Sequence, residues 1–201
     1  MAIRIMIMAG GTGGHVFPAL AVAEYLRQAG HEVSWLGTKK GIEARVVPEA
    51  GIDIDWLSVS GLRGKGLASL LLAPFMLLKA CYQASIIIRQ RQPDVVLGLG
   101  GFASGPGGLM SWLHGKPLVI HEQNRVPGTT NRLLKNIAKR VLEAFPRSFE
   151  NKTQAVFTGN PVRKELLGHS LKETKSNTNV LVVGGSLGAS VLNEVVPDAL
   201  Q

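Results

Sequence analysis

The sequence at residues 3–15, IRIMIMAGGTGGH, decides the fold. A continuous apolar run that ends in a cluster of glycines, followed by the helical pattern of residues 19–29, is typical of a buried parallel strand, a turn and a helix. Glycines let a ligand approach the main chain, and the N–H groups at the start of the next helix attract an anion. Thr12 and His15 add a hydroxyl and an imidazole that a turn made only for packing does not need. We therefore expect an anion site at this turn of an α/β protein.

Two common nucleotide-binding loops do not fit this turn. A dinucleotide-binding loop needs a third glycine where Val16 stands, and an acidic residue at the end of the next strand. That strand, at residues 32–36, is followed instead by GTKK at 37–40. A Walker-type loop also fails, because no Gly-Lys-Ser/Thr follows the glycines. The expectation that remains is a site for a diphosphate-sized anion without a nicotinamide cofactor.

The amino-acid composition limits the kinds of molecule that this chain is expected to bind. The 201 residues carry a net charge of +8 and are 45% apolar, which is enough to bury a core and favours anionic partners. The anionic partners to consider are nucleic acid, phosphorylated substrates and an anionic membrane surface. Nucleic acid is the least supported of the three, since aromatic residues are few and no basic run interleaves with them. A lone cysteine, Cys81, excludes an intrachain disulfide and fits a reducing cytosol. The first residues, MAIR, lack the charged region of a signal peptide, so none is expected.

The rest of the chain repeats the strand and helix pattern. Strands are expected at residues 32–36, 52–59, 94–99, 118–120 and 140–145, and helices at residues 42–50, 67–91 and 128–136. Asp53 and Asp55 alternate with apolar residues in the third strand. We interpret them as the solvent face of an edge strand and assign no metal.

The helix at residues 67–91 is the most apolar one. Its uninterrupted apolar part is shorter than the roughly 20 residues that a bilayer requires, and Pro74 interrupts its first third. Lys65, Lys79 and Arg89 surround it, as in a helix that lies at a lipid interface. The basic loop at residues 60–66 before it is a candidate phosphate contact, although a solvated linker has the same composition.

Two further predicted strands are followed by residues typical of a binding site. The strand at 94–99 runs into a second glycine-rich turn at residues 100–108. The strand at 118–120 is followed directly by four polar residues, HEQN at 121–124. Ligands of open α/β sheets bind outside the carboxyl ends of strands, so these residues predict a second part of the site.

The last part of the chain begins a new unit. Residues 168–179 are polar and unpatterned, as in a linker, and residues 180–189 repeat the buried strand and glycine turn before another helix. We expect a Rossmann-like domain at 1–163 and a linker plus the start of a second domain at 164–201. One βα unit cannot close a core, so the chain is expected to be a piece of a longer protein or to pack on something else.

Six ordered motifs together carry a family resemblance. They are MAGGTGGH at 8–15, SGLRGK at 60–65, DVVLG at 94–98 with GPG at 105–107, HEQN at 121–124, GNPVR at 159–163 and VGGSLGA at 183–189. The chain resembles the bacterial peptidoglycan N-acetylglucosaminyltransferases of glycosyltransferase family 28. The resemblance implies a GT-B fold of two Rossmann-like domains, of which residues 1–163 would be the acceptor and membrane-binding one.

The resemblance also implies an activity. Such enzymes transfer GlcNAc with inversion from UDP-GlcNAc to the C4 hydroxyl of MurNAc in undecaprenyl-pyrophosphoryl-MurNAc-pentapeptide (lipid I) and produce lipid II, without a cofactor or metal. They act as peripheral proteins on the cytoplasmic face of the bacterial inner membrane, so an anionic membrane surface is an expected partner. The family's elements that read uracil and ribose lie in the second domain, beyond Gln201.

Site residues follow from matching motif positions. The resemblance puts Thr12, Gly13 and Gly14 at the donor, with Asn124 contacting it from the fifth strand. Arg163 and Ser186 are expected to hold the donor from the side of the second domain.

Two residues are candidates for catalysis. His15 is expected to act at the acceptor, as general base for the C4 hydroxyl or as a diphosphate ligand, because a helix N-terminus disfavours the imidazolium form. Glu122 is the rival base. Two other functions stay open, a different sugar-nucleotide enzyme such as an epimerase, and a membrane-associated non-catalytic fragment.

Overall fold

A computed structural model describes residues 1–58, 67–149, 154–166, 180–184 and 190–199. The chain divides into two compact units, Met1–Leu167 and Gly168–Gln201, and each is described by itself. The basic loop expected at residues 60–66, the linker at 168–179 and Ser186 lie outside the described residues. The domain boundary expected after residue 163 stays a prediction.

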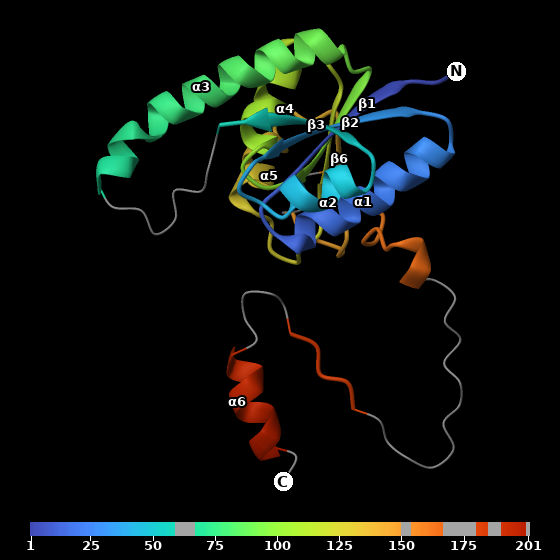
Figure 1. Cartoon of the computed structure of the whole chain (residues 1–201), viewed down its shortest axis with the longest axis vertical. Coiled ribbons are helices and arrows are strands. Elements are labelled where there is room, and N and C mark those ends of the chain that lie inside the picture. Colours follow the sequence, from blue (N-terminus) through green and yellow to red (C-terminus); the bar gives the residue numbers. More distant parts are fainter. Residues whose placement is uncertain (59–66, 150–153, 167–179, 185–189, 200–201) are drawn as a thin grey trace. The chain divides into compact units, whose positions relative to one another are not determined.

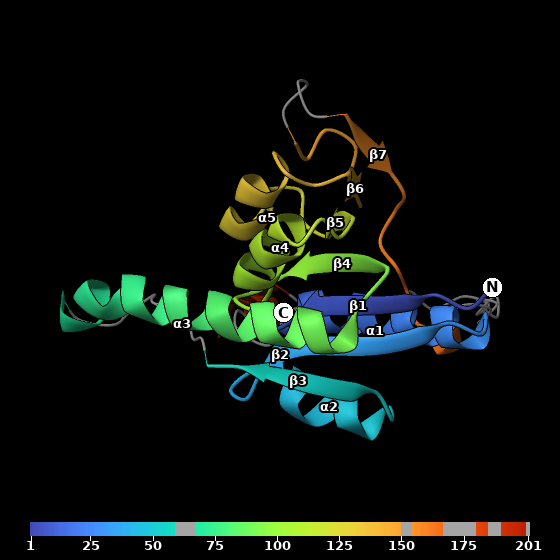
Figure 2. The same cartoon turned by 90° about the horizontal axis from the view of Figure 1, so that it is seen from above.

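The first unit is built on a parallel sheet of seven strands (Figures 1 and 2). The strand order is β3-β2-β1-β4-β5-β6-β7, so the direction of winding reverses between β1 and β4. In parallel sheets such a reversal opens a crevice at the carboxyl ends of the two strands. The strands are β1 (Arg4–Ala9), β2 (Glu32–Thr38), β3 (Asp53–Leu57), β4 (Val95–Gly100), β5 (Leu118–Glu122), β6 (Arg140–Glu143) and β7 (Ala155–Phe157).

Helices cover both faces of this sheet. The helices of the first unit are α1 (Gly13–Gln28), α2 (Glu43–Glu49), α3 (Leu67–Arg91), α4 (Ser104–Leu113) and α5 (Thr129–Leu134), with a 3₁₀ turn at Lys164–Leu166. Alternate residues of β1 divide the core: Ile5 and Ile7 pack with α1 and α2, whereas Met6 and Met8 face the layer that contains α3 and α5. This arrangement confirms the predicted doubly wound, Rossmann-like α/β fold.

Strand β3 is the edge strand that the sequence predicted. Arg91, at the end of α3, lies 2.8 Å from Asp55 and 3.2 Å from Asp53. The two carboxylates therefore hold a helix end against the edge of the sheet. Helix α3 has the predicted bounds, and no helix in the described parts of the chain is long and apolar enough to cross a membrane.

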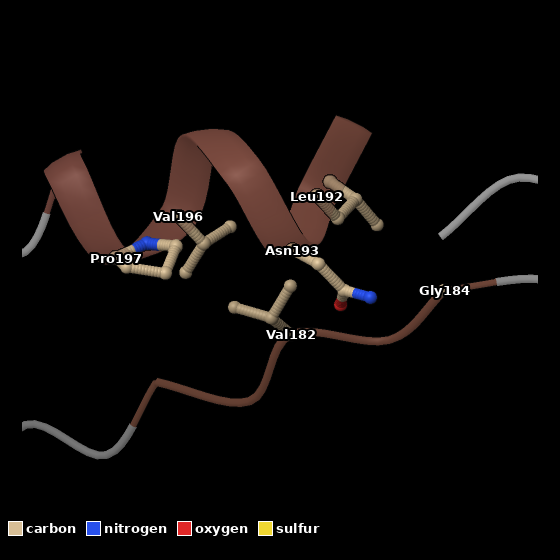
Figure 3. A pocket seen from close by; sticks show the side chains of 6 residues that line it. All are labelled: Val182, Gly184, Leu192, Asn193, Val196 and Pro197. Atoms are coloured by element: carbon tan, nitrogen blue, oxygen red, sulfur yellow. The ribbon is translucent and has the colours of Figure 1, made fainter. Parts of the chain in front are cut away.

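The second unit differs from its prediction. Residues 180–184 form no strand, and the side chains of Val180, Leu181 and Val183 are exposed. A buried parallel strand needs hydrogen-bonding neighbours, and the described residues of this unit provide none. The helix α6 (Ser190–Ala199) does form. It faces the extended residues across an open hollow of about 270 Å³ (Figure 3).

Candidate functional site

Two glycine turns meet where the winding of the sheet reverses. Gly11, after β1, has φ +91°, and Gly101, after β4, has φ +86°. A Cβ on Gly101 would overlap the carbonyl oxygen of Gly10, so the main chains of the two turns are in direct contact. Because α1 and α4 both begin beside these turns, two helix N-termini lie at the carboxyl ends of β1 and β4, where a sheet of this kind is expected to bind its ligand.

The start of α1 carries the three residues predicted to bind the donor. Thr12 is the N-cap, with φ −108° and ψ 158°, and its hydroxyl makes no capping hydrogen bond. Its carbonyl accepts the N–H groups of His15 and Val16, at 3.1 and 3.2 Å. Gly13 and Gly14 form the first turn, where main-chain N–H groups have no intrahelical partner. The exposed Thr12 and Gly14 thus present a hydroxyl and N–H donors suited to phosphate oxygens.

A buried carboxylate fixes the first glycine turn. Glu43, at the start of α2, is fully buried and accepts the N–H of Gly11 at 2.9 Å. It also accepts the N–H of Thr38 at 3.0 Å and the Thr38 hydroxyl at 2.7 Å. The sequence pattern did not single out Glu43. The available signal was an acidic residue among the apolar positions of the short helix, beside Gly41.

We expect Glu43→Gln to destabilise the first unit by about 2 to 4 kcal/mol. The glutamine NH₂ would face at least one buried N–H or hydroxyl donor, and an unmatched buried donor is costly. Glu49→Gln is the matched control, since it removes the same charge from an exposed position on α2 and should change stability by about 0.5 kcal/mol or less. Urea unfolding of both variants measures the difference. Equal stabilities would contradict the role given to Glu43.

The second polar cluster lies partly inside the sheet. Strand β5 continues two residues beyond its predicted end, so His121 and Glu122 are buried within it, a correction to the expectation that the strand ends before them. The Glu122 carboxylate accepts the N–H and side-chain amide of Asn124, both at 3.0 Å, the N–H of Gly128 at 3.1 Å and the Asn131 amide at 2.9 Å. Four donors occupy this carboxylate, an arrangement that favours positioning Asn124 over exchanging protons with a substrate.

His15 belongs to a chain of hydrogen bonds. Its Nδ1 lies 2.8 Å from Gln123 Oε1, and the Gln123 amide nitrogen lies 3.0 Å from Nδ1 of His121. His121 Nε2 lies 3.0 Å from the carbonyl oxygen of Gly159. Burial lowers the pKa of His121, against smaller raising effects of the Gly159 carbonyl and the Glu122 charge. The neutral form of His121 is therefore favoured.

Arg163 reaches the start of α1 by stacking on an aromatic ring. Its guanidinium lies 5.1 Å from the ring centroid of Phe17. The same ring borders the main chain of Gly13, where an added Cβ would lie 2.9 Å from it. Phe17, which the sequence did not single out, thus links Arg163 to the glycine turn at the start of α1. Of the predicted site residues, all except Ser186 are described, and those from Thr12 to His15 lie together at the start of α1.

Comparisons with known proteins give the class. Residues 5–143 match the N-terminal domain of glycosyltransferase family 28, and the chain belongs to this family. It is 63% identical over 201 residues to the UDP-N-acetylglucosamine–N-acetylmuramyl-(pentapeptide) pyrophosphoryl-undecaprenol N-acetylglucosamine transferase of Methylococcus capsulatus. It is 56% identical over 207 residues to the protein of the same name from Nitrosococcus oceani. In both cases the match covers the whole chain and 57% of the relative, so the chain spans just over half their length.

Solved structures agree with this assignment. The crystal structure of Acinetobacter baumannii MurG matches 98% of the chain with a TM-score of 0.80 and 44% identity, and 57% of that chain is covered. A UDP-N-acetylglucosamine 2-epimerase matches 80% of the chain and 49% of its own, with a TM-score of 0.59 and 16% identity. The second likeness shows only a shared fold. The predicted family is therefore confirmed.

Proposed function

We propose that this chain is the acceptor-side part of an inverting transferase that moves GlcNAc from UDP-GlcNAc to the C4 hydroxyl of MurNAc in lipid I, giving lipid II. The observation that carries the proposal is the 63% identity to the Methylococcus capsulatus transferase over the whole chain. The relatives are longer, and we propose that the complete reaction also uses the part of them that lies outside the matched region.

Each site residue has a role in this reaction. The C4 oxygen of the acceptor attacks the anomeric carbon of GlcNAc on the face opposite UDP, and the C1–O bond to the β-phosphate breaks. The N–H groups of Gly13 and Gly14, the Thr12 hydroxyl and the Arg163 cation stabilise the diphosphate, which leaves with the bonding electrons. Asn124, held by Glu122, orients the sugar, and Ser186 is a further proposed donor ligand. His15 accepts the C4 proton.

A chimera tests the proposal. Residues 1–163 are joined to the remaining part of the Methylococcus capsulatus relative, and the product is incubated with lipid I and UDP-GlcNAc labelled in the sugar. We expect label in a lipid product, at a rate within about tenfold of the intact relative, and none with residues 1–201 alone. Conversion of UDP-GlcNAc without acceptor would favour an epimerase instead. A folded chimera that transfers no sugar to lipid I would contradict the proposal.

We further propose that α3 and α4 form a surface for anionic membrane, on the cytoplasmic face where lipid I is presented. Phe75, Leu78 and Tyr82 of α3 are exposed, with exposed fractions of 70%, 67% and 69%. Trp112 and Leu113 add exposed apolar area from α4, which packs on α3 through the Ser85–His114 hydrogen bond of 2.7 Å. The basic residues that accompany this surface are Lys79 and Arg89. The first half of α3 projects beyond the sheet (Figures 1 and 2).

The double variant Phe75→Ser/Leu78→Ser should weaken binding to anionic vesicles by about 100-fold, because each side chain contributes about 1.5 kcal/mol when buried in lipid. Co-sedimentation over a salt series measures this, and salt should also weaken binding of the parent chain. Tyr25→Ser is the control, since Tyr25 is equally exposed on α1. Binding that is the same for the parent and the double variant would exclude this surface. Leu71 and Leu72, which lie earlier on the same helix, have side chains outside the described residues.

A further inference from the structure

We propose that Gln123 and His121 are positioning residues that fix the tautomer of His15, so that Nδ1 carries the proton and Nε2 is left as the basic atom. The use of that base rests on the proposed function, whereas the tautomer itself does not. The proposal follows from three consecutive hydrogen bonds, which are read from the end where donor and acceptor cannot exchange roles.

That end is the carbonyl oxygen of Gly159. A carbonyl oxygen only accepts, so Nε2 of His121, at 3.0 Å, must donate to it. His121 is 3% exposed, and burial lowers its pKa, so the ring is neutral with a single proton. That proton is already placed on Nε2. Nδ1 of His121 is therefore an acceptor.

The Gln123 amide is oriented by two acceptors on one side. Its NH₂ group lies 3.0 Å from Nδ1 of His121 and 3.0 Å from the main-chain oxygen of the same residue. If the amide were rotated by half a turn, Oε1 of Gln123 would face the lone pair on Nδ1 of His121 and the main-chain oxygen of the same residue. Gln123 is buried, with 5% of its surface exposed, so water does not replace the lost donors. Oε1 is thus held on the side of His15.

The tautomer of His15 follows from this orientation. Its Nδ1 lies 2.8 Å from Oε1, an acceptor, and must donate. A neutral imidazole has one proton, so Nε2 carries a lone pair, and no described residue hydrogen-bonds it. The ring fits against the end of β4 because Gly100 has no side chain; a Cβ there would lie 3.0 Å from Nδ1.

This tautomer suits the proposed chemistry. When the acceptor C4 hydroxyl attacks, its proton passes to Nε2, and the new imidazolium keeps its Nδ1–H bond to Gln123 Oε1. Free histidine favours the opposite tautomer, with the proton on Nε2, in which the basic atom would be blocked. Gln123 and His121 thus act on the reaction through His15 and need not touch the substrate themselves.

The test is the tautomeric state measured by long-range ¹H–¹⁵N correlation spectra of residues 1–201 with ¹⁵N-labelled histidine, at about pH 8, where imidazoles are neutral. His15→Ala and His121→Ala assign the signals among the five histidines. We expect protonated Nδ1 in His15 and protonated Nε2 in His121. Protonated Nε2 in His15 of the parent chain would overturn the proposal by itself, whatever the chimera does in the transfer assay.

Two variants distinguish control of the His15 tautomer by Gln123 from a purely structural role of that residue. Gln123→Ala removes the acceptor, so the His15 tautomer ratio should shift toward protonated Nε2 by about tenfold, the worth of one neutral hydrogen bond. Gln123→Glu keeps an acceptor toward His15, so Nδ1 of His15 should stay protonated even though the second carboxylate oxygen cannot donate to His121. In the chimera, Gln123→Ala should lower kcat by about tenfold at unchanged KM. An unchanged His15 tautomer in Gln123→Ala would contradict the proposal.

Discussion

Replacing His15 by alanine in the chimera is expected to lower kcat by about 10²- to 10⁴-fold, the usual contribution of a general base. The KM for UDP-GlcNAc should stay near that of the parent, because the N–H groups of Gly13 and Gly14 and the Thr12 hydroxyl remain. The physical reason is that the C4 hydroxyl loses the lone pair that takes its proton. Steady-state rates at saturating lipid I measure the effect. His31→Ala is the control, since Nδ1 of His31 accepts a hydrogen bond from the N–H of Ile3 at the other end of β1, away from the site.

Glu122→Gln decides between the two candidate bases. The variant keeps the volume of Glu122 but turns an NH₂ toward donors such as the Asn131 amide and the N–H of Gly128. We expect it to lower stability and to raise KM through a displaced Asn124, with a smaller effect on kcat than His15→Ala. A parent-like kcat for His15→Ala, together with loss of activity in Glu122→Gln, would show that Glu122 is the base.

Gly101→Ala is expected to destabilise the first unit by about 2 to 6 kcal/mol. Part of this cost, about 1 to 3 kcal/mol, is strain, because φ at Gly101 is +86°. The rest is overpacking of about 1 to 3 kcal/mol, because the new Cβ would overlap the main chain of Gly10. Main-chain atoms of a turn held by Glu43 cannot move aside as a flexible side chain can. The contact between the two glycine turns therefore makes the total loss of stability larger than backbone strain alone would cause.

Gly115→Ala isolates the strain from the contact. Gly115 also has a positive φ, +67°, but an added Cβ there would have no neighbour within 4 Å. This control should lose only about 1 to 3 kcal/mol. Urea unfolding of both variants gives the difference. Equal losses at Gly101 and Gly115 would show that the turns after β1 and β4 do not touch.

The sequence predicted the parts of the fold that depend on local pattern. Apolar runs that end in glycines located β1 and β4, and the apolar pattern before Pro93 gave α3 its bounds. Strand β7 was not predicted, because three residues are too few for a periodicity. The strand expected at residues 180–183 was wrong, because an apolar run indicates burial only where neighbours are present to bury it.

The contacts of the site were harder to predict than its position. The glycine turns follow β1 and β4 and the HEQN segment overlaps the end of β5, which runs two residues further than predicted. Sequence alone could not pair Glu43 with Gly11 or His15 with Gln123, which are 32 and 108 residues apart, because such pairs depend on the register of the sheet. It also treated Glu122 as a residue outside the strand, since a buried carboxylate is rare unless several donors surround it, and those donors are not visible in a pattern.

The central claim is that this chain holds the acceptor side and the base, and that recognition of the uridine belongs to the part of the relatives outside the match. Calorimetric titration with UDP-GlcNAc of residues 1–201 and of the chimera tests it most directly. We predict a dissociation constant weaker than about 1 mM for the chain and near about 1 μM for the chimera, a difference of about 4 kcal/mol. Micromolar binding by residues 1–201 alone would contradict this division of the site.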